Sequence, residues 1–266
     1  MASRSASVDA VRICGSALPG LQAIAAESNR SFPRHMHDVF GIGVMDRGGQ
    51  RSASGRGAVE AVRGDVITVN PGEVHDGVAM RGEARAWRML HLAPALLSDG
   101  VPSGFELTRP VLSDPALRLG FDRLFAAVVE GDDALVLEQG VLQLLRNAPG
   151  ARAPESPKRV APAAMERARA RIADDCTHAP TLAELAHEAG LSRYQLLRGF
   201  AVAFGLPPHA WLQQCRLSRA RRLIVQGRAL ADAAADAGFA DQSHMTRAFV
   251  RFLGFTPGAY AAARSG

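Results

Sequence analysis

The sequence predicts an α+β protein of two domains, a strand-rich N-terminal half and an all-helical C-terminal half. Short strand-like runs separated by glycine and charged turns occupy residues 21 to 93. After residue 163 the apolar residues recur at helical spacing instead. A proline-rich stretch at residues 147 to 162 lies between the halves and is expected to be an extended linker. With 266 residues and 47% hydrophobic content, the chain is long enough to build a core in each half.

Cysteine usage and hydropathy restrict the expected compartment. The cysteines Cys14, Cys176 and Cys215 are widely scattered and odd in number, which suits a reducing compartment better than a disulfide framework. The N-terminus has no sustained apolar run, and no apolar run anywhere reaches the length of a membrane-spanning helix. We therefore expect a cytoplasmic protein.

The strands of the N-terminal half are expected to form a small antiparallel barrel with a cluster of histidines. His35 and His37 stand two residues apart in a strand-like run, so both point to one face. His75 follows a second strand, which ends in the turn at Pro71 and Gly72. If they converge, the three histidines line a polar pocket or satisfy one another and backbone groups at the barrel mouth, and a zinc or iron site is the alternative.

Two amphipathic helices are predicted between the strands and the linker. Asp114 and Pro115 begin the first helix, and each helix carries one apolar face. The apolar residues are Leu117, Phe121, Leu124, Phe125 and Val128 in the first helix and Leu137, Val141, Leu144 and Leu145 in the second. These faces are expected to pack on the barrel or to pair two copies of the chain. The expected segments are 1–112 for the barrel, 113–146 for the helices, 147–162 for the linker and 163–266 for the C-terminal domain.

Positive charge is concentrated in the C-terminal half. Residues 158 to 266 hold 15 Lys and Arg against 8 Asp and Glu, whereas the whole chain carries a net charge of only +5. A basic module beside a near-neutral one is typical of nucleic-acid binding, and a solubilising surface is the alternative.

The basic half contains one structural unit twice, at about residues 181–204 and 229–253. Gly190 corresponds to Gly238 at a separation of 48 residues. The pairs that follow, all 49 residues apart, are Arg198 with Arg247, Phe200 with Phe249, Gly205 with Gly254, Pro208 with Pro257 and Trp211 with Tyr260. In each unit an Ala-rich helix ends at the glycine, and Ser192 or Asp241 caps a second helix. Each unit is therefore predicted to be a helix-turn-helix.

The second helix of each unit has a predicted core face and a predicted polar face. The core residues are Leu196, Gly199, Phe200 and Ala203 in the first unit and Met245, Ala248, Phe249 and Phe252 in the second. Polar residues and arginine at the exposed start of such a helix suit base edges and phosphates in a major groove. The connection from Pro207 to Gly227 reads as one helix of about 28 Å, which would hold the two second helices roughly one DNA turn apart.

These motifs resemble those of the AraC/XylS transcription regulators. The resemblance covers about residues 163 to 263 and rests on "GFADQSHMTRAFVRFLGFTPGAY", preceded by "LSRYQLLRGF" and "RLSRARRLI". It implies a seven-helix domain in which residues 193–204 and 242–253 contact double-stranded DNA. The contact residues that it implies are Arg193, Tyr194, Leu197, Arg198, Gln242, Ser243, His244, Thr246 and Arg247. Leu197 departs from the polar residue expected at its position and offers only an apolar contact, for instance to a thymine methyl group.

The same resemblance implies a cupin-like fold and a sensor role for the N-terminal half. The carboxylate that metal cupins place four or five residues after the histidine pair is missing, because Gly41 and Ile42 stand there. His35, His37 and His75 are therefore expected to line the pocket of a small-molecule effector, with no metal and no cofactor. The family also implies a possible homodimer and, if the protein is an activator, contact with RNA polymerase.

The resulting hypothesis is an effector-responsive, sequence-specific transcription regulator that is not an enzyme. A metal-dependent cupin enzyme with an accessory DNA-binding domain is the main alternative, and a DNA-organising protein without a sensor is another. A hydrolase triad of Asp241, Ser243 and His244 is excluded by geometry, because adjacent residues on a helix point about 100° apart.

Overall fold

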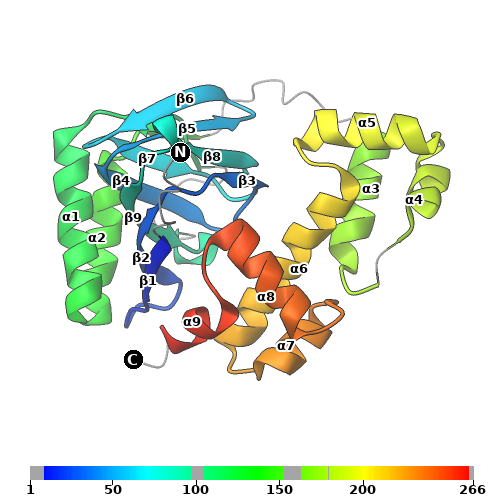
Figure 1. Cartoon of the computed structure of the whole chain (residues 1–266). Helices are drawn as coiled ribbons and strands as arrows, with labels where there is room; N and C mark the ends of the chain where they lie inside the picture. The colour runs from blue at the N-terminus through cyan, green and yellow to red at the C-terminus, as the bar shows by residue number, and fades with distance from the viewer. Residues whose placement is uncertain (1–8, 98–104, 153–162, 179, 264–266) are drawn as a thin grey trace, which may run out of the picture. The chain divides into compact units, whose positions relative to one another are not determined.

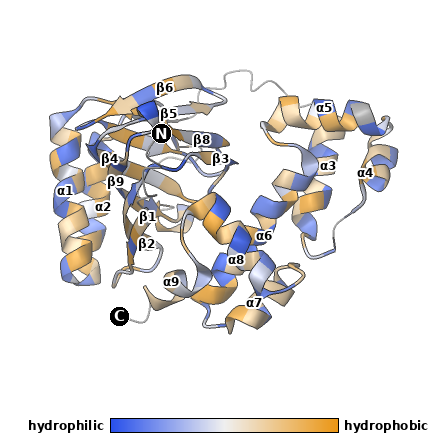
Figure 2. Cartoon of the chain, in the orientation of Figure 1, coloured by the Kyte–Doolittle hydropathy of each residue, from blue (hydrophilic) through white to orange (hydrophobic). Residues whose placement is uncertain are grey.

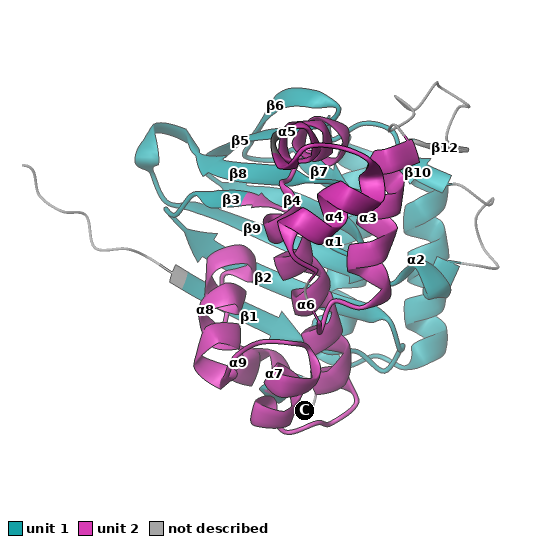
Figure 3. Cartoon of the chain, turned by 90° about the vertical axis from the view of Figure 1, so that its right-hand side faces the viewer, with its two compact units in different colours: residues 1–33, 37–154, 262–266 teal, residues 34–36, 155–261 magenta. Residues whose placement is uncertain are grey.

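The computed structural model describes residues 9–97, 105–152, 163–178 and 180–263. The chain divides into two compact units (Figure 3). One is strand-rich and comprises Met1–Pro33, His37–Pro154 and Ala262–Gly266; the other is helical and comprises Arg34–Met36 and Glu155–Ala261. Strands therefore come first and helices second along the chain, which confirms the predicted α+β class.

The strand-rich unit contains two main sheets. The six-stranded sheet has the order β1 (Asp9–Cys14), β2 (Leu21–Ser28), β9 (Arg85–Leu92), β4 (Phe40–Arg47), β7 (Val66–Val69) and β11 (Val111–Leu112). The four-stranded sheet has the order β3 (Phe32–His35), β8 (His75–Ala79), β5 (Gly49–Ser54) and β6 (Gly57–Val62). Two short 3-10 helices, η1 (Met80–Gly82) and η2 (Pro94–Leu97), flank β9 in the sequence. The strand pairs with a defined register are antiparallel, as the sequence predicted.

Two helices, α1 (Pro115–Glu130) and α2 (Ala134–Asn147), cover one face of the six-stranded sheet (Figure 1). Both helices alternate between apolar and polar residues (Figure 2), and all nine residues of the predicted apolar faces are buried. They share one core with every second residue of β4, namely Phe40, Ile42 and Val44. The Asp114 carboxylate begins α1 by accepting hydrogen bonds from two backbone N–H groups. Packing within the unit is thus sufficient to explain both apolar faces.

An ion-pair cluster joins α1 to β9. Arg88 donates two hydrogen bonds of 2.8 Å to the Asp46 carboxylate and one of 2.8 Å to Asp122 on α1. Its guanidinium carbon also lies 5.1 Å from the ring centroid of Phe125. The hydrogen bonds to Asp46 are the main cause of a raised pKa for Arg88. The charge of Arg88 is therefore fully compensated at the interface between sheet and helix.

The opposite face of β9 buries a second arginine, Arg85, which has no exposed surface. Arg85 donates hydrogen bonds to Gln50 Oε1 at 2.9 Å, to the Arg30 carbonyl at 2.9 Å and to the Gly77 carbonyl at 3.3 Å. Its guanidinium carbon lies 5.0 Å from the Trp87 ring centroid, and burial lowers its pKa to about 10. Within the described parts of the chain no carboxylate forms an ion pair with Arg85, so neutral oxygens and a ring compensate its charge.

Part of the segment expected to be a linker pairs as a strand. β12 (Gly150–Arg152) follows α2 and pairs antiparallel with β10 (Phe105–Leu107). Residues 153–162, which make up most of the expected linker, lie outside the described residues.

The described part of the helical unit contains seven helices, the number that the family resemblance implied. They are α3 (Ala163–Asp174), α4 (Leu182–Ala189), α5 (Arg193–Phe204), α6 (Pro208–Val225), α7 (Leu230–Asp236), α8 (Gln242–Leu253) and α9 (Pro257–Ala262). α5 and α8 have the bounds expected of the two DNA-contacting helices, and α6 is the single connecting helix predicted between Pro207 and Gly227. Among the described helices, none has both the length and the apolar character needed to cross a membrane.

Arg85→Ala is expected to lower the free energy of unfolding of the strand-rich unit by about 3 kcal/mol, because it leaves one buried and two partly buried oxygens without their donor and opens space beside Trp87. Urea unfolding measures the change. Arg12→Ala, at an exposed position of β1, serves as the control and is expected to shift stability by less than about 0.5 kcal/mol. A loss below about 1 kcal/mol for Arg85→Ala would contradict the structural role.

Candidate DNA interface and histidine pocket

Both second helices of the repeat begin with a defined cap. In the first unit the Ser192 hydroxyl accepts a hydrogen bond from the Gln195 backbone N–H at 3.2 Å, and Gln195 Oε1 accepts one from the Ser192 N–H at 2.9 Å. In the second unit the Asp241 carboxylate accepts a hydrogen bond of 2.6 Å from the His244 backbone N–H. These are the two capping residues that the sequence predicted, so the first turn of α5 and of α8 is fixed in place.

The predicted core face of α8 is confirmed, and that of α5 is confirmed at Leu196 and Phe200, whereas Gly199 and Ala203 are half-buried. Leu196, Phe200, Met245 and Phe249 have no exposed surface, and Ala248 and Phe252 are also buried. A side chain at Gly199 would meet Met165 of α3 at 3.1 Å, so α3 packs closely on this face. Because one face of each helix is buried in the core, the opposite face is exposed to solvent or to a partner.

Of the predicted contact residues, Arg198, Ser243 and Arg247 lie on that opposite face, and Arg193, Gln242 and His244 flank it at the helix starts. Five of them are exposed and carry a polar or charged side chain: Arg193, Arg198, Gln242, Ser243 and Arg247. His244 and Thr246 are half-buried, and the side chain of Tyr194 is outside the described part of the structure. In the described structure no ion pair engages the arginines, whose guanidinium groups are therefore available to phosphates or base edges. DNA contact by each residue stays a prediction.

His244 also has a structural role. Its ring packs edge-to-face on Phe239, with the centroids 5.2 Å apart, and its Nδ1 lies 3.5 Å from the Ala240 backbone nitrogen. Asp241 holds the backbone N–H of His244 rather than its imidazole. The local geometry therefore makes Asp241 and His244 parts of a helix start, in agreement with the exclusion of a hydrolase triad.

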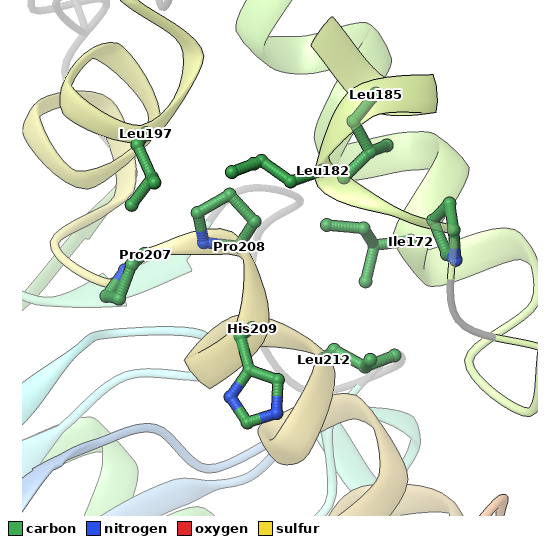
Figure 4. A pocket seen from close by; sticks show the side chains of 9 residues that line it. Ile172, Leu182, Leu185, Leu197, Pro207, Pro208, His209 and Leu212 are labelled. Carbon is green, nitrogen blue, oxygen red and sulfur yellow. The ribbon is translucent and has the colours of Figure 1, made fainter. Parts of the chain in front are cut away.

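Leu197 lines an apolar pocket beside the first helix-turn-helix (Figure 4). The pocket has a volume of about 150 Å³, and α3, α4 and α6 contribute Ile172, Leu182, Leu185 and Leu212 to its wall. Leu197 is 40% exposed, so its side chain reaches both the pocket and the outer face of α5. The apolar residue that departs from the family pattern is thus part of a local apolar cluster.

The structure brings the three predicted pocket histidines together. Each of His35, His37 and His75 offers a ring nitrogen, and these nitrogens lie within 4.8 Å of one another. The rings of His37 and His75 have centroids 5.3 Å apart. His75 Nδ1 lies 3.0 Å from the Glu73 carbonyl oxygen, which orients the ring, and burial lowers the pKa of His75. His75 is therefore neutral at pH 7, with Nε2 as its hydrogen-bond acceptor or metal ligand.

A fourth histidine, His91 on β9, joins the cluster and was not among the predicted pocket residues. Its ring centroid lies 5.5 Å from that of His37, and the register of β4 and β9 pairs it with Gly41. A side chain at Gly41 would lie 3.9 Å from the His91 ring. His91 therefore occupies the surroundings of the position at which a cupin carboxylate is missing.

Comparison with known proteins agrees with this architecture. A family model described as an AraC-like ligand binding domain matches residues 18–145, and one described as a helix-turn-helix domain matches residues 185–263. An HTH-type transcriptional regulator of Bacillus subtilis, YbfI, is 28% identical over 230 residues, which cover 81% of this chain and 82% of YbfI. The transcriptional activator NphR of a Rhodococcus species is 41% identical over 81 residues, or 30% of this chain and only 24% of NphR.

Solved structures of ToxT from Vibrio cholerae have the same two-part fold. One of them, with an unsaturated fatty acid bound, aligns with 100% of this chain and 99% of its own, with a TM-score of 0.52 and 13% identity. A structure of the apo K231A variant of ToxT aligns with 98% of each chain, with a TM-score of 0.55 and 12% identity. At this level of identity the likeness concerns the fold.

Asp241→Ala is expected to destabilise the helical unit by about 1 kcal/mol, because the first turn of α8 loses the acceptor of its backbone N–H. Ser243→Ala, at an exposed position in the same first turn of α8, is the matched control. It is expected to change stability by less than about 0.5 kcal/mol. Urea unfolding followed by circular dichroism distinguishes the two. Equal stabilities of both variants would show that Asp241 does not cap α8.

Proposed function

The chain belongs to the AraC family of transcription regulators, and we propose that its N-terminal domain binds a small-molecule effector that changes promoter occupancy by its two helix-turn-helix units. It is a DNA-binding transcription regulator with an N-terminal ligand-binding domain. In the proposal residues 1–112 sense the effector, residues 113–146 support the sensor, and residues 163–266 bind DNA. We propose no enzymatic activity, and we place its action in the cytoplasm, where a promoter is accessible.

The observation that carries the DNA-binding part is the equivalent placement of Arg198 and Arg247 on two capped helices. Each is exposed on the face opposite a fully buried phenylalanine, Phe200 or Phe249. A guanidinium in this position suits bidentate contact with guanine or with a phosphate. The nine contact residues expected from the family are therefore proposed as the DNA-contacting surface of α5 and α8, with Leu197 supplying an apolar contact.

The histidine cluster is proposed as the polar wall of the effector pocket. His37 and His75 lie in contact, and a neutral His75 whose Nδ1 donates to the Glu73 carbonyl presents Nε2 as an acceptor. A metal site is the second candidate, favoured by the convergence of His35, His37 and His75. Nitrogens on one tetrahedral zinc ion lie about 3.4 Å apart, so ring nitrogens within 4.8 Å of one another need only a small inward movement. In that case a zinc ion would link the three histidines as a structural or sensory ligand.

A homodimer is proposed through the outer surfaces of α1 and α2. Leu135 and Leu142 lie seven residues apart on α2 and are 65% and 39% exposed, and Leu119 on α1 is 50% exposed. Apolar residues repeated at this spacing are suited to pairing between helices. Contact with RNA polymerase is proposed only if the protein activates transcription.

Arg247→Ala is expected to reduce affinity for the operator by about 1 to 3 kcal/mol while leaving affinity for random DNA nearly unchanged, because a bidentate base contact is lost. Arg251→Ala removes the same charge near the end of α8, where the guanidinium covers Phe252, and is the control. Fluorescence anisotropy with operator and random duplexes at one fixed salt concentration gives both affinities. Equal losses on both duplexes would make Arg247 a phosphate contact, and a wild-type protein without any preference would refute the function.

Metal analysis and ligand-induced thermal shifts separate the two candidates for the histidine cluster. The effector proposal expects no stoichiometric metal after purification, and a thermal shift with one member of a metabolite panel that His37→Gln abolishes. His187→Gln, at an exposed position of α4, is the control. Fatty acids belong in the panel because a ToxT structure holds one. One equivalent of zinc or iron that is lost in His37→Gln would establish the metal site instead.

A further inference from the structure

The turn of the second helix-turn-helix packs against the loop that leads into the first one. Gly238, in this turn, has φ +84°, and a Cβ atom there would lie 2.7 Å from Thr177 Cα and 3.0 Å from Arg216 Nε. Gly190 holds the equivalent position in the first unit with φ +68°, and a Cβ atom there would meet nothing within 4 Å. The glycine is therefore needed in the first unit for its backbone conformation alone, and in the second for close packing as well.

Arg216, in the middle of α6, joins this packing. Its Nε donates a hydrogen bond of 2.8 Å to the Cys176 carbonyl, and its Nη2 donates one of 3.2 Å to the Thr177 carbonyl. In the described residues no carboxylate forms an ion pair with Arg216, so its charge is directed at these two carbonyl groups. The guanidinium thus connects the loop between α3 and α4 to the connecting helix.

The loop itself is held in shape by Asp175. The Asp175 carboxylate accepts hydrogen bonds from the Thr177 backbone N–H at 2.9 Å and from the Thr177 hydroxyl at 2.5 Å, and it lies 3.0 Å from His178 Nδ1. The two carbonyl groups that meet Arg216 are therefore arranged in advance. One turn further along α6, Arg219 donates a hydrogen bond of 2.7 Å to the carbonyl of Asp236, the last residue of α7.

These contacts form what we term the inter-repeat junction, made of residues 175–178, Arg216 and Gly238. The connecting helix α6 sets the distance between the two helix-turn-helix motifs. Rotation of either motif about α6 is limited only by the packing of side chains. The junction adds a direct link between the loop that leads into the first helix-turn-helix and the turn of the second. Its Gly238 lies between α7 and α8, where a small rotation would change the direction of α8.

We propose that the inter-repeat junction, through Arg216, fixes the orientation of α8 relative to α5 and so sets the spacing at which one chain reads two successive major grooves. The proposal rests on the DNA-binding function proposed above. One additional base pair between half-sites moves the second groove by about 3.4 Å and rotates it by roughly 35°. A rigid junction makes binding sensitive to such a change, and a loosened junction tolerates it.

The test uses the full-length protein and an operator defined by footprinting, with one base pair inserted or deleted between the two protected grooves. Wild-type affinity is expected to fall about tenfold or more with either change, and affinity of Arg216→Gln by less than about threefold. On an operator with one half-site replaced by random sequence, the two proteins are expected to bind equally. Arg167→Gln removes the same charge from an exposed position of α3 and is expected to keep the wild-type spacing dependence.

A glycine pair provides an independent measurement. Gly190→Ala and Gly238→Ala both place alanine at positive φ, but only Gly238→Ala pushes on Thr177 and Arg216. The spacing dependence is therefore expected to be lost in Gly238→Ala and kept in Gly190→Ala. Arg216→Lys, which keeps one charged donor for the loop carbonyls, is expected to restore part of it.

The outcomes separate the two proposals. Specific binding with the same spacing dependence in wild type, Arg216→Gln and Gly238→Ala would overturn the role of the junction and leave the regulator function intact. Absence of any specific operator would refute the function itself. Thermal unfolding of each variant identifies misfolding, and Gly238→Ala then decides the question if Arg216→Gln does not fold.

Discussion

Burial of one phenylalanine in each repeat determines which face of the second helix meets a partner. Phe200 and Phe249 have no exposed surface, and each lies one helical turn after another fully buried side chain, Leu196 or Met245. Rotation of α5 or α8 about its axis would bring two large apolar side chains into water at once, at a cost of several kcal/mol. The capping residues fix the helix starts along the axis. This core determines the direction of Arg198 and Arg247, because they lie on the helix face opposite the buried phenylalanine.

The two units share this core but differ in the chemistry of their outer faces. At equivalent positions the first unit has Leu197, which belongs to an apolar pocket, and the second has the half-buried Thr246. At the third position of each helix, the side chains of Gln195 and His244 both turn back toward the backbone that precedes the helix. Gln195 Oε1 accepts from the Ser192 N–H, and His244 Nδ1 faces the Ala240 N–H. A chain that reads DNA with both units therefore presents two different surfaces, and an operator that fits both is asymmetric within one protomer.

Strand alternation divides the sensor unit in a similar way. On β9 the side chains of Arg88 and Leu90 meet α1 or the core beneath it, whereas those of Arg85 and His91 project from the opposite face. Arg88 is compensated by carboxylates, but Arg85 is compensated only by neutral oxygens and aromatic rings. The helix-covered face thus provides stability, and the polar groups that can recognise a ligand are collected on the other face.

The sequence alone predicted the parts of the structure that depend on local signals. Capping residues, terminating glycines and apolar stripes lie within a few residues of what they determine, so the bounds of α5 and α8 could be anticipated. The convergence of His75 with His35 and His37 joins distant parts of the chain and was expected from the resemblance to cupins. The contribution of His91 depends on the register of β4 with β9, and the strand β12 on a partner far away in the sequence.

The inter-repeat junction was beyond prediction for a different reason. The partners of Arg216 are backbone carbonyls, which every residue carries, so no side chain marks the loop as its acceptor. Gly238 looked equivalent to Gly190 because both end a helix and both require positive φ. Only the surroundings of the two glycines distinguish them, and a repeat found in sequence therefore establishes a shared fold for its copies without establishing how one copy contacts the other.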